Sequence, residues 1–124
     1  MNNVPFVTRV RNLLIAAARE GRPRGYSEYA SALGLNPRAW SHLQRVIRAL
    51  KDIMLQDHRC GRPFFSVAAV SRSGRLAVLP GKGFALLAWQ LGRFIPGEDY
   101  RAFVSREWDR FRAHCLSSPE NQVA

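Results

Sequence analysis

The stretch GYSEYASALGLNPRAWSHLQRVIRALKD, residues 25–52, constrains the fold most, because it has the pattern of two helices joined by a tight break. We expect Ser27 to cap a short helix that ends at the glycine of the break. Asn36 is the predicted cap of a second helix, which has Pro37 in its first position and continues to about Met54. A short helix, a glycine-containing break and a longer amphipathic helix are typical of a helix-turn-helix.

The second of these helices has two different faces. Apolar residues recur along one face at helical spacing, so we expect that face to pack on the core. It consists of Trp40, Leu43, Ile47, Leu50 and Met54. The opposite face carries Arg38, Ser41, Arg45 and Arg48. These residues form either an ordinary solvated surface or a contact surface for an anionic partner.

The period changes after residue 64. FFSVAAVSRSGRLAVLP is rich in β-branched and aromatic residues and carries SRSG in its middle, which predicts a hairpin of Phe65–Ser71 with Arg75–Leu79. Such a hairpin after a helix-turn-helix makes a winged helix, with Arg72 and Arg75 at the tip of the wing.

Helical periodicity also predicts three further helices, at residues 5–19, 84–91 and 98–115. The expected fold class is therefore α+β: a small winged-helix-like domain, helix-turn-helix plus β-hairpin, with an added C-terminal helix. Residues 1–116 form the single expected domain, and residues 117–124 form a flexible tail.

The charge is strongly positive and unevenly distributed. The net charge is +10, and arginine supplies 17 of the 19 basic residues. The excess lies in residues 1–97, whereas residues 98–112 hold four basic and four acidic side chains. An excess of this sign indicates an anionic partner, with nucleic acid first. A GC-rich genome would explain the preference for arginine over lysine but not the sign of the total.

The expected nucleic-acid contacts follow from this distribution. Residues near the start of the second helix are placed to reach base edges, and later ones to reach phosphates. Trp40 is among the former unless it packs in the core, which its place on the apolar face favours. The start of the preceding helix and the PGKGF turn supply further phosphate contacts. The predicted contact residues are Tyr26, Ser27, Arg38, Ser41, His42, Arg45, Arg48, Lys51, Arg72, Arg75 and Lys82.

No catalytic, metal or cofactor site is predicted. His58 and Cys60 in DHRCGRP raise the alternative of a cysteine nucleophile, because a thiol needs a nearby base or cation to ionise. The two cysteines and three histidines lack the spacing of a zinc site. We expect a cytoplasmic protein without a signal peptide, since no apolar run reaches the length of a membrane span.

The stretch GYSEYASALGLNPRAW resembles the winged-helix DNA-binding segment of O6-alkylguanine DNA alkyltransferases and alkyltransferase-like proteins. The resemblance implies that Tyr26 occupies the place of the family tyrosine that rotates a nucleotide phosphate. Ser41 stands where the family has an arginine finger, and the Pro-Cys-His-Arg active site is absent. Methyl transfer is therefore not expected.

The span from Tyr26 to Leu91 also resembles a group of uncharacterised bacterial and phage proteins. The matching motifs are YSE, GRPFFSVAAV and PGKGF. This second resemblance bears on the boundaries of the fold and implies no activity.

The sequence thus predicts a non-catalytic protein that binds double-stranded DNA through a basic helix-turn-helix and wing. The alternative is a protein-interaction module of a phage or mobile element that acts on an acidic partner or a nucleoprotein complex. A partner or a second copy would then bind the C-terminal helix through Phe103, Trp108 and Phe111, unless these aromatics pack in the core. The third hypothesis is a cysteine-dependent DNA-modifying enzyme that uses Cys60.

Overall fold

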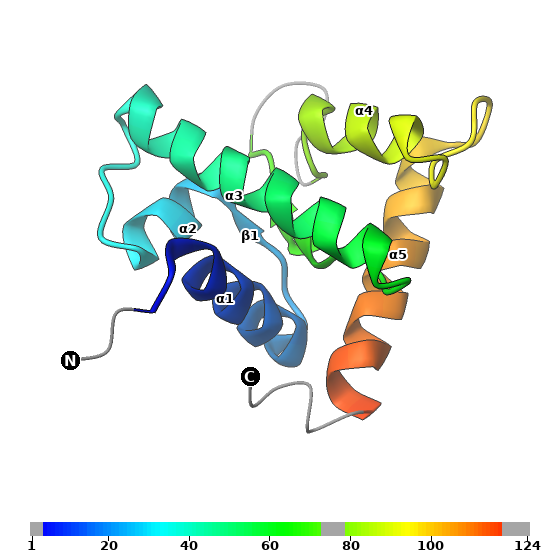
Figure 1. Ribbon diagram of the computed structural model, residues 1–124, viewed down its shortest axis with the longest axis horizontal. Coiled ribbons are helices and arrows are strands. Elements are labelled where there is room, and N and C mark those ends of the chain that lie inside the picture. The colour runs from blue at the N-terminus through cyan, green and yellow to red at the C-terminus, as the bar shows by residue number, and fades with distance from the viewer. Residues whose placement is uncertain (1–3, 73–78, 118–124) are drawn as a thin grey trace.

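The computed structural model of the protein describes residues 4–72 and 79–117, and these residues form a mostly helical α+β arrangement (Figure 1). Five α-helices, one 3-10 helix and a two-stranded parallel sheet occur in the described part of the chain. In chain order these elements are α1 (Phe6–Glu20), β1 (Arg24–Gly25), α2 (Tyr26–Ala32), α3 (Trp40–Arg59), η1 (Phe65–Ala68), β2 (Ala69–Val70), α4 (Lys82–Gln90) and α5 (Tyr100–Ser117).

The core forms where α1, α3 and α5 pack around the short helix η1. All four residues of η1 are buried, and Phe65 lies against Phe111 of α5 with their ring centroids 4.6 Å apart. Helix α3 crosses the middle of the molecule, with α1 on one side and α4 on the other (Figure 1). One side of α3 supplies core residues, and this burial explains why an amphipathic sequence forms a long helix here.

Two buried carboxylates hold the start of η1. Asp57 of α3 accepts a hydrogen bond from the Phe65 N–H at 2.8 Å, and Glu107 of α5 accepts one from the Phe64 N–H at 3.0 Å. Neither acid is more than 1% exposed. Burial raises the pKa of Asp57, and the Phe65 N–H and the Arg62 guanidinium oppose that rise. We call these two acids the carboxylate clamp.

Arginines neutralise the charge of the carboxylate clamp. Arg62 donates a hydrogen bond to Asp57 at 2.8 Å. Glu107 accepts hydrogen bonds from Arg93 at 3.1 Å and from Arg110 at 2.7 Å. A buried charge without a partner is strongly destabilising, so these contacts are part of the fold. They also remove three arginines from those available to an outside partner.

The rest of η1 and strand β2 are fixed by hydroxyl groups. Ser66 donates to the Leu50 carbonyl of α3, and Tyr29 of α2 donates to the Ala68 carbonyl, both at 2.8 Å. Strand β2 then pairs in parallel with β1, placing Arg24 opposite Ala69. Helix α2, which follows β1 directly, is thereby held against the core.

The short helix is present, but its predicted cap is wrong. Helix α2 begins at Tyr26 after Gly25, one residue before the expected cap Ser27. The Glu28 carboxylate accepts a hydrogen bond from the Gly25 N–H at 3.0 Å. This bond and Arg72 lower the pKa of Glu28, so the carboxylate stays ionised where it closes the turn.

The long helix is also present but is displaced along the sequence. It begins at Trp40 and extends to Arg59, whereas the predicted helix ran from Pro37 to about Met54. Asn36 does not cap it: its side-chain oxygen accepts the Arg38 N–H at 3.0 Å, closing a local turn. Such a side-chain-to-backbone turn competes with helix formation, which explains the later start.

The predicted strand Phe65–Ser71 is wrong over its first four residues, which form η1. Its last part contains β2, whose described pairing is parallel to β1 and not antiparallel. The Ser71 N–H does donate to the Leu79 carbonyl at 2.8 Å, which joins the two ends of the expected wing. The expected second strand, Arg75–Leu79, lies outside the described residues except for Leu79.

The other helices agree with the predictions in type and place. Helix α4 begins two residues earlier than expected, and α5 begins two residues later than the expected start at residue 98. Phe103 and Phe111 of α5 are buried, and Trp108 packs against the same core. The core interpretation of these aromatics is therefore confirmed, and Phe103 and Phe111 are not exposed to a partner.

Removing either acid of the carboxylate clamp should lower the free energy of unfolding by about 3 kcal/mol, because a buried N–H and an arginine lose their acceptor. Urea denaturation of Asp57→Ala and Glu107→Ala measures this effect. Asp109→Ala is the matched control, since Asp109 is exposed on α5 and should unfold like the wild type. Equal stability of all three variants would contradict a structural role for the clamp.

Candidate nucleic-acid interface

A groove runs along the side of α3 that faces α4. It has a volume of about 280 Å³, and its lining is mostly apolar, with two lysines at its edge. Helix α3 supplies five of the lining residues, and the rest come from the start of α2, from η1 and from the start of α4. The lining residues are Tyr26, Trp40, Ile47, Leu50, Lys51, Met54, Ser66, Gly81, Lys82, Gly83 and Phe84.

Two tyrosines hold the PGKG turn that forms one wall of the groove. The Gly81 N–H donates to the Tyr26 hydroxyl at 2.7 Å, and the Tyr100 hydroxyl donates to the Pro80 carbonyl at 2.6 Å. A Cβ at Gly81 would lie 3.1 Å from the Tyr26 oxygen, so the close approach favours glycine there. Burial raises the pKa of Tyr26, and its phenol therefore stays protonated at neutral pH.

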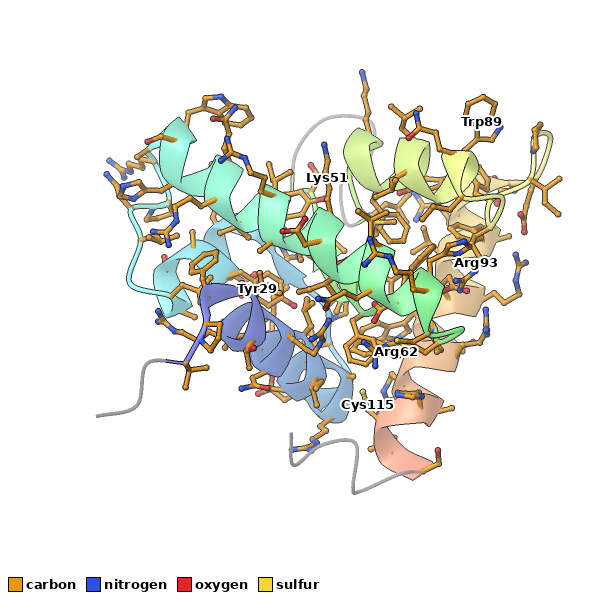
Figure 2. The ribbon with its side chains drawn as sticks, viewed as in Figure 1. Tyr29, Lys51, Arg62, Trp89, Arg93 and Cys115 are labelled. Atoms are coloured by element: carbon orange, nitrogen blue, oxygen red, sulfur yellow. The ribbon has the colours of Figure 1, made fainter. Side chains whose placement is uncertain are left out.

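The basic face of α3 lies beside this groove. We use this name for Arg45, Arg48, Lys51 and Arg59, which are all exposed. At 3.6 residues per turn, Lys51 lies between the groove and the other three. Figure 2 shows Lys51 at the edge of α3 that faces α4. Its Cε would lie 3.5 Å from a Cβ at Gly83, so the lysine extends over the PGKG turn.

Most cations of this region have no acidic partner. Within residues 4–72 and 79–117, Arg48, Lys51 and Lys82 make no ion pair. Six arginines of the described residues pair with acids, whereas the exposed Arg9, Arg19, Arg22, Arg38 and Arg101, away from the groove, make no ion pair. The paired arginines are Arg24, Arg62, Arg72, Arg93, Arg106 and Arg110. One part of the uncompensated charge of the described residues therefore lies beside the groove.

Three of the predicted contact residues have structural partners. The Tyr26 hydroxyl is bound to the PGKG turn, and His42 accepts the Asn36 N–H on its Nδ1 at 2.8 Å. Arg45 lies over the ring of Phe6 in α1, with its guanidinium carbon 4.3 Å from the ring centroid. These contacts reduce the freedom of the three side chains to meet a ligand.

The other predicted contacts are divided among separate regions. Arg38, Ser41 and Ser27 are exposed, the first on the turn before α3. Arg72 donates to Glu28 at 2.8 Å, so an acid already compensates its charge. Arg75 lies outside the described residues. Lys82 is exposed at the start of α4, on the edge of the groove.

Sequence reasoning missed two residues of this region. The core position favoured for Trp40 is wrong, because its side chain is 65% exposed at the mouth of the groove. Its position as the first residue of α3 is the reason, because the core begins further along the helix. Arg59 lies beyond the predicted end of the helix at about Met54, and the longer helix observed places it on the same face as Arg45 and Arg48.

The cysteines lie in different environments. Cys60 is exposed just after α3, and Cys115 is buried in α5, where burial raises its pKa to about 11. Across the described ranges, no His, Cys, Asp and Glu side chains cluster in a way that could hold a metal ion. The titratable side chains that line the groove are Tyr26, Lys51 and Lys82.

Comparisons with protein-family models, with curated proteins and with solved structures give no match to this chain. None of the helices in the described part of the chain is long and apolar enough to cross a membrane.

Tyr26→Phe should lower the free energy of unfolding by about 1 kcal/mol, because the Gly81 N–H loses its acceptor. Chemical denaturation provides the measurement. The matched control is Ser27→Ala, which alters an exposed hydroxyl in the same helical turn and should change stability by less than about 0.5 kcal/mol. A larger loss in Ser27→Ala than in Tyr26→Phe would restore Ser27 as the cap of α2.

Proposed function

We propose that this chain is a non-catalytic nucleic-acid-binding protein, with DNA as its ligand and the basic face of α3 as its main contact surface. The observation that carries the proposal is the group of exposed cations without acidic partners beside the groove: Arg48, Lys51 and Lys82. Phosphate contacts supply most of the sequence-independent affinity of such proteins. A protein with a net charge of +10 would also attract an anionic polymer over a long range.

The finer fold proposal is a winged-helix-like domain. Helices α2 and α3, with the turn between them, correspond to the helix-turn-helix, and α3 is the recognition helix. The hydrogen bond from Ser71 to Leu79 supports a wing, because it brings the two ends of that segment together. Arg72, next to this bond, would meet the phosphate backbone while it remains close to Glu28.

Reversing two charges on the basic face should strongly weaken DNA binding without unfolding the protein. Arg48 and Lys51 suit this change, since both are exposed and neither makes an ion pair with any described residue. In Arg48→Glu/Lys51→Glu, binding should be lost at moderate salt. If weak binding persists at low salt, the slope of log Kobs against log salt should fall by about 2 in magnitude, because two phosphate contacts are gone.

The matched control for this double variant is Arg22→Glu/Arg101→Glu. It makes the same change in net charge at two exposed arginines on other parts of the surface. Fluorescence anisotropy with a labelled duplex at several salt concentrations compares the two, and thermal melts check folding. An equal loss of affinity in both variants would show a dependence on net charge alone and would contradict the assignment to α3.

A second candidate is a protein-interaction module, and one observation favours it. Leu86 and Trp89 of α4 and Ile95 after it are all more than half exposed. Trp89 projects from the side of α4 that faces away from α3 (Figure 2). Exposed apolar groups of this kind mark binding surfaces when they occur together.

Trp89→Ser should separate the two candidates, because α4 would meet a protein partner through this side chain. Under the DNA-binding proposal the variant binds duplex like the wild type. Under the protein-interaction hypothesis, Trp89→Ser weakens the self-association of the protein or its binding to an acidic protein partner. Sedimentation velocity over a range of concentrations, together with anisotropy on the same samples, provides both measurements.

A further inference from the structure

The exposed indole of Trp40 has no structural explanation in the described part of the chain. A tryptophan is a large apolar group, and Trp40 leaves 65% of its surface accessible at the mouth of the groove. It is not a member of the hydrophobic core cluster. An exposed aromatic ring in a groove that also carries unpaired cations is the combination that single-stranded nucleic acids bind, because every base has an apolar π-face.

The groove continues from Trp40 with an apolar floor. Ile47, Leu50 and Met54 of α3 and Phe84 of α4 line it. Trp40 and Lys51 lie eleven residues apart on α3, which at the rise of an α-helix is about 16 Å. Stacked nucleotides rise ~3.4 Å each along a strand, so the groove is long enough for more than one nucleotide.

The groove is also lined by two lysines. Lys51 reaches over Gly83, and Lys82 starts α4 on the opposite wall. Neither lysine pairs with an acid within the described residues. No carboxylate lines the groove. An aromatic ring and apolar groups, together with two cations, complement a ligand that has flat apolar rings on a phosphate chain.

We propose, resting on the nucleic-acid function above, that this groove binds unpaired nucleotides of a single-stranded segment. A base stacks on Trp40, further base surface covers Ile47 and Phe84, and the phosphates lie beside Lys51 and Lys82. A duplex fits this lining less well. Its bases are stacked on one another, so it offers phosphates to the lysines but no π-face to the indole or the apolar floor.

The test compares strands that carry the same phosphates with and without bases. The labelled probes are an oligothymidylate, an abasic strand of equal length, a blunt duplex and an oligouridylate, and anisotropy at one salt concentration measures each affinity. The wild type should bind the oligothymidylate at least about ten-fold more tightly than the abasic strand, the size expected when bases stack on an aromatic residue.

Trp40→Ala should remove that preference and leave the affinity for the abasic strand unchanged, because the lysines remain. Trp40→Phe should keep much of the preference for the oligothymidylate, since a phenyl ring still stacks on a base. Trp89→Ala is the matched control, another half-exposed tryptophan outside the groove lining, and should behave like the wild type. Trp40 makes few contacts with the core, so thermal melts of all variants should agree.

Several outcomes would overturn the inference. These are equal wild-type affinities for the oligothymidylate and the abasic strand, a preference that survives in Trp40→Ala, and duplex binding tighter than that of any single strand. Equal binding of the oligouridylate would support it, because base and phosphate are the shared chemistry. If no strand or duplex binds even at low salt, the proposed function itself fails and an acidic peptide becomes the better occupant of the groove.

Discussion

The carboxylate clamp of Asp57 and Glu107 is the interaction on which the rest of the described structure depends. Two consecutive backbone N–H groups, at Phe64 and Phe65, enter the core where no strand or helix accepts them. Asp57 of α3 and Glu107 of α5 accept the hydrogen bonds of these two N–H groups. This contact fixes the position of η1 between the helices, and η1 in turn leads directly into β2.

The effects of this arrangement reach the groove through a short series of contacts. Strand β2 pairs with β1, and β1 runs directly into α2, which begins at Tyr26. The Tyr26 hydroxyl then holds the PGKG turn from which α4 starts. The wall of the groove opposite α3 is therefore positioned by contacts that begin at the clamp. A rigid wall of this kind is what a preformed binding site requires.

The distribution of acids determines where the positive charge remains. Five acids pair with arginines in the described structure, namely Glu20, Glu28, Asp57, Glu98 and Glu107. The clamp and the α2 cap use three of them. Asp52 is the only exposed acid on α3, among at least four exposed cations of the same helix. Some arginines of this chain are therefore part of its fold, whereas Arg48, Lys51 and Lys82 beside the groove make no ion pair with a described residue.

The sequence by itself predicts most of the helices, the break between α2 and α3, and the positive charge of the chain. These features are local: the apolar period, the turn residues and the composition are properties of neighbouring residues. The start of α3 could not be predicted, because Asn36 forms a turn with Arg38 and does not cap the helix. The sequence of η1 reads as a strand because its β-branched and aromatic residues reflect full burial and not extended pairing.

The candidate site was decided by the tertiary structure. Tyr26 and Gly81 are distant in sequence, as are Lys82 and Trp40, and only packing brings them to one groove. The exposure of Trp40 likewise depends on where α3 leaves the core, and the spacing of apolar residues in the sequence does not predict that point. Sequence established that this chain has helices and an excess of positive charge, since both follow from residue type and spacing. The fold alone determined which cations remain unpaired and which aromatic ring shares a groove with them, because that depends on contacts between distant segments.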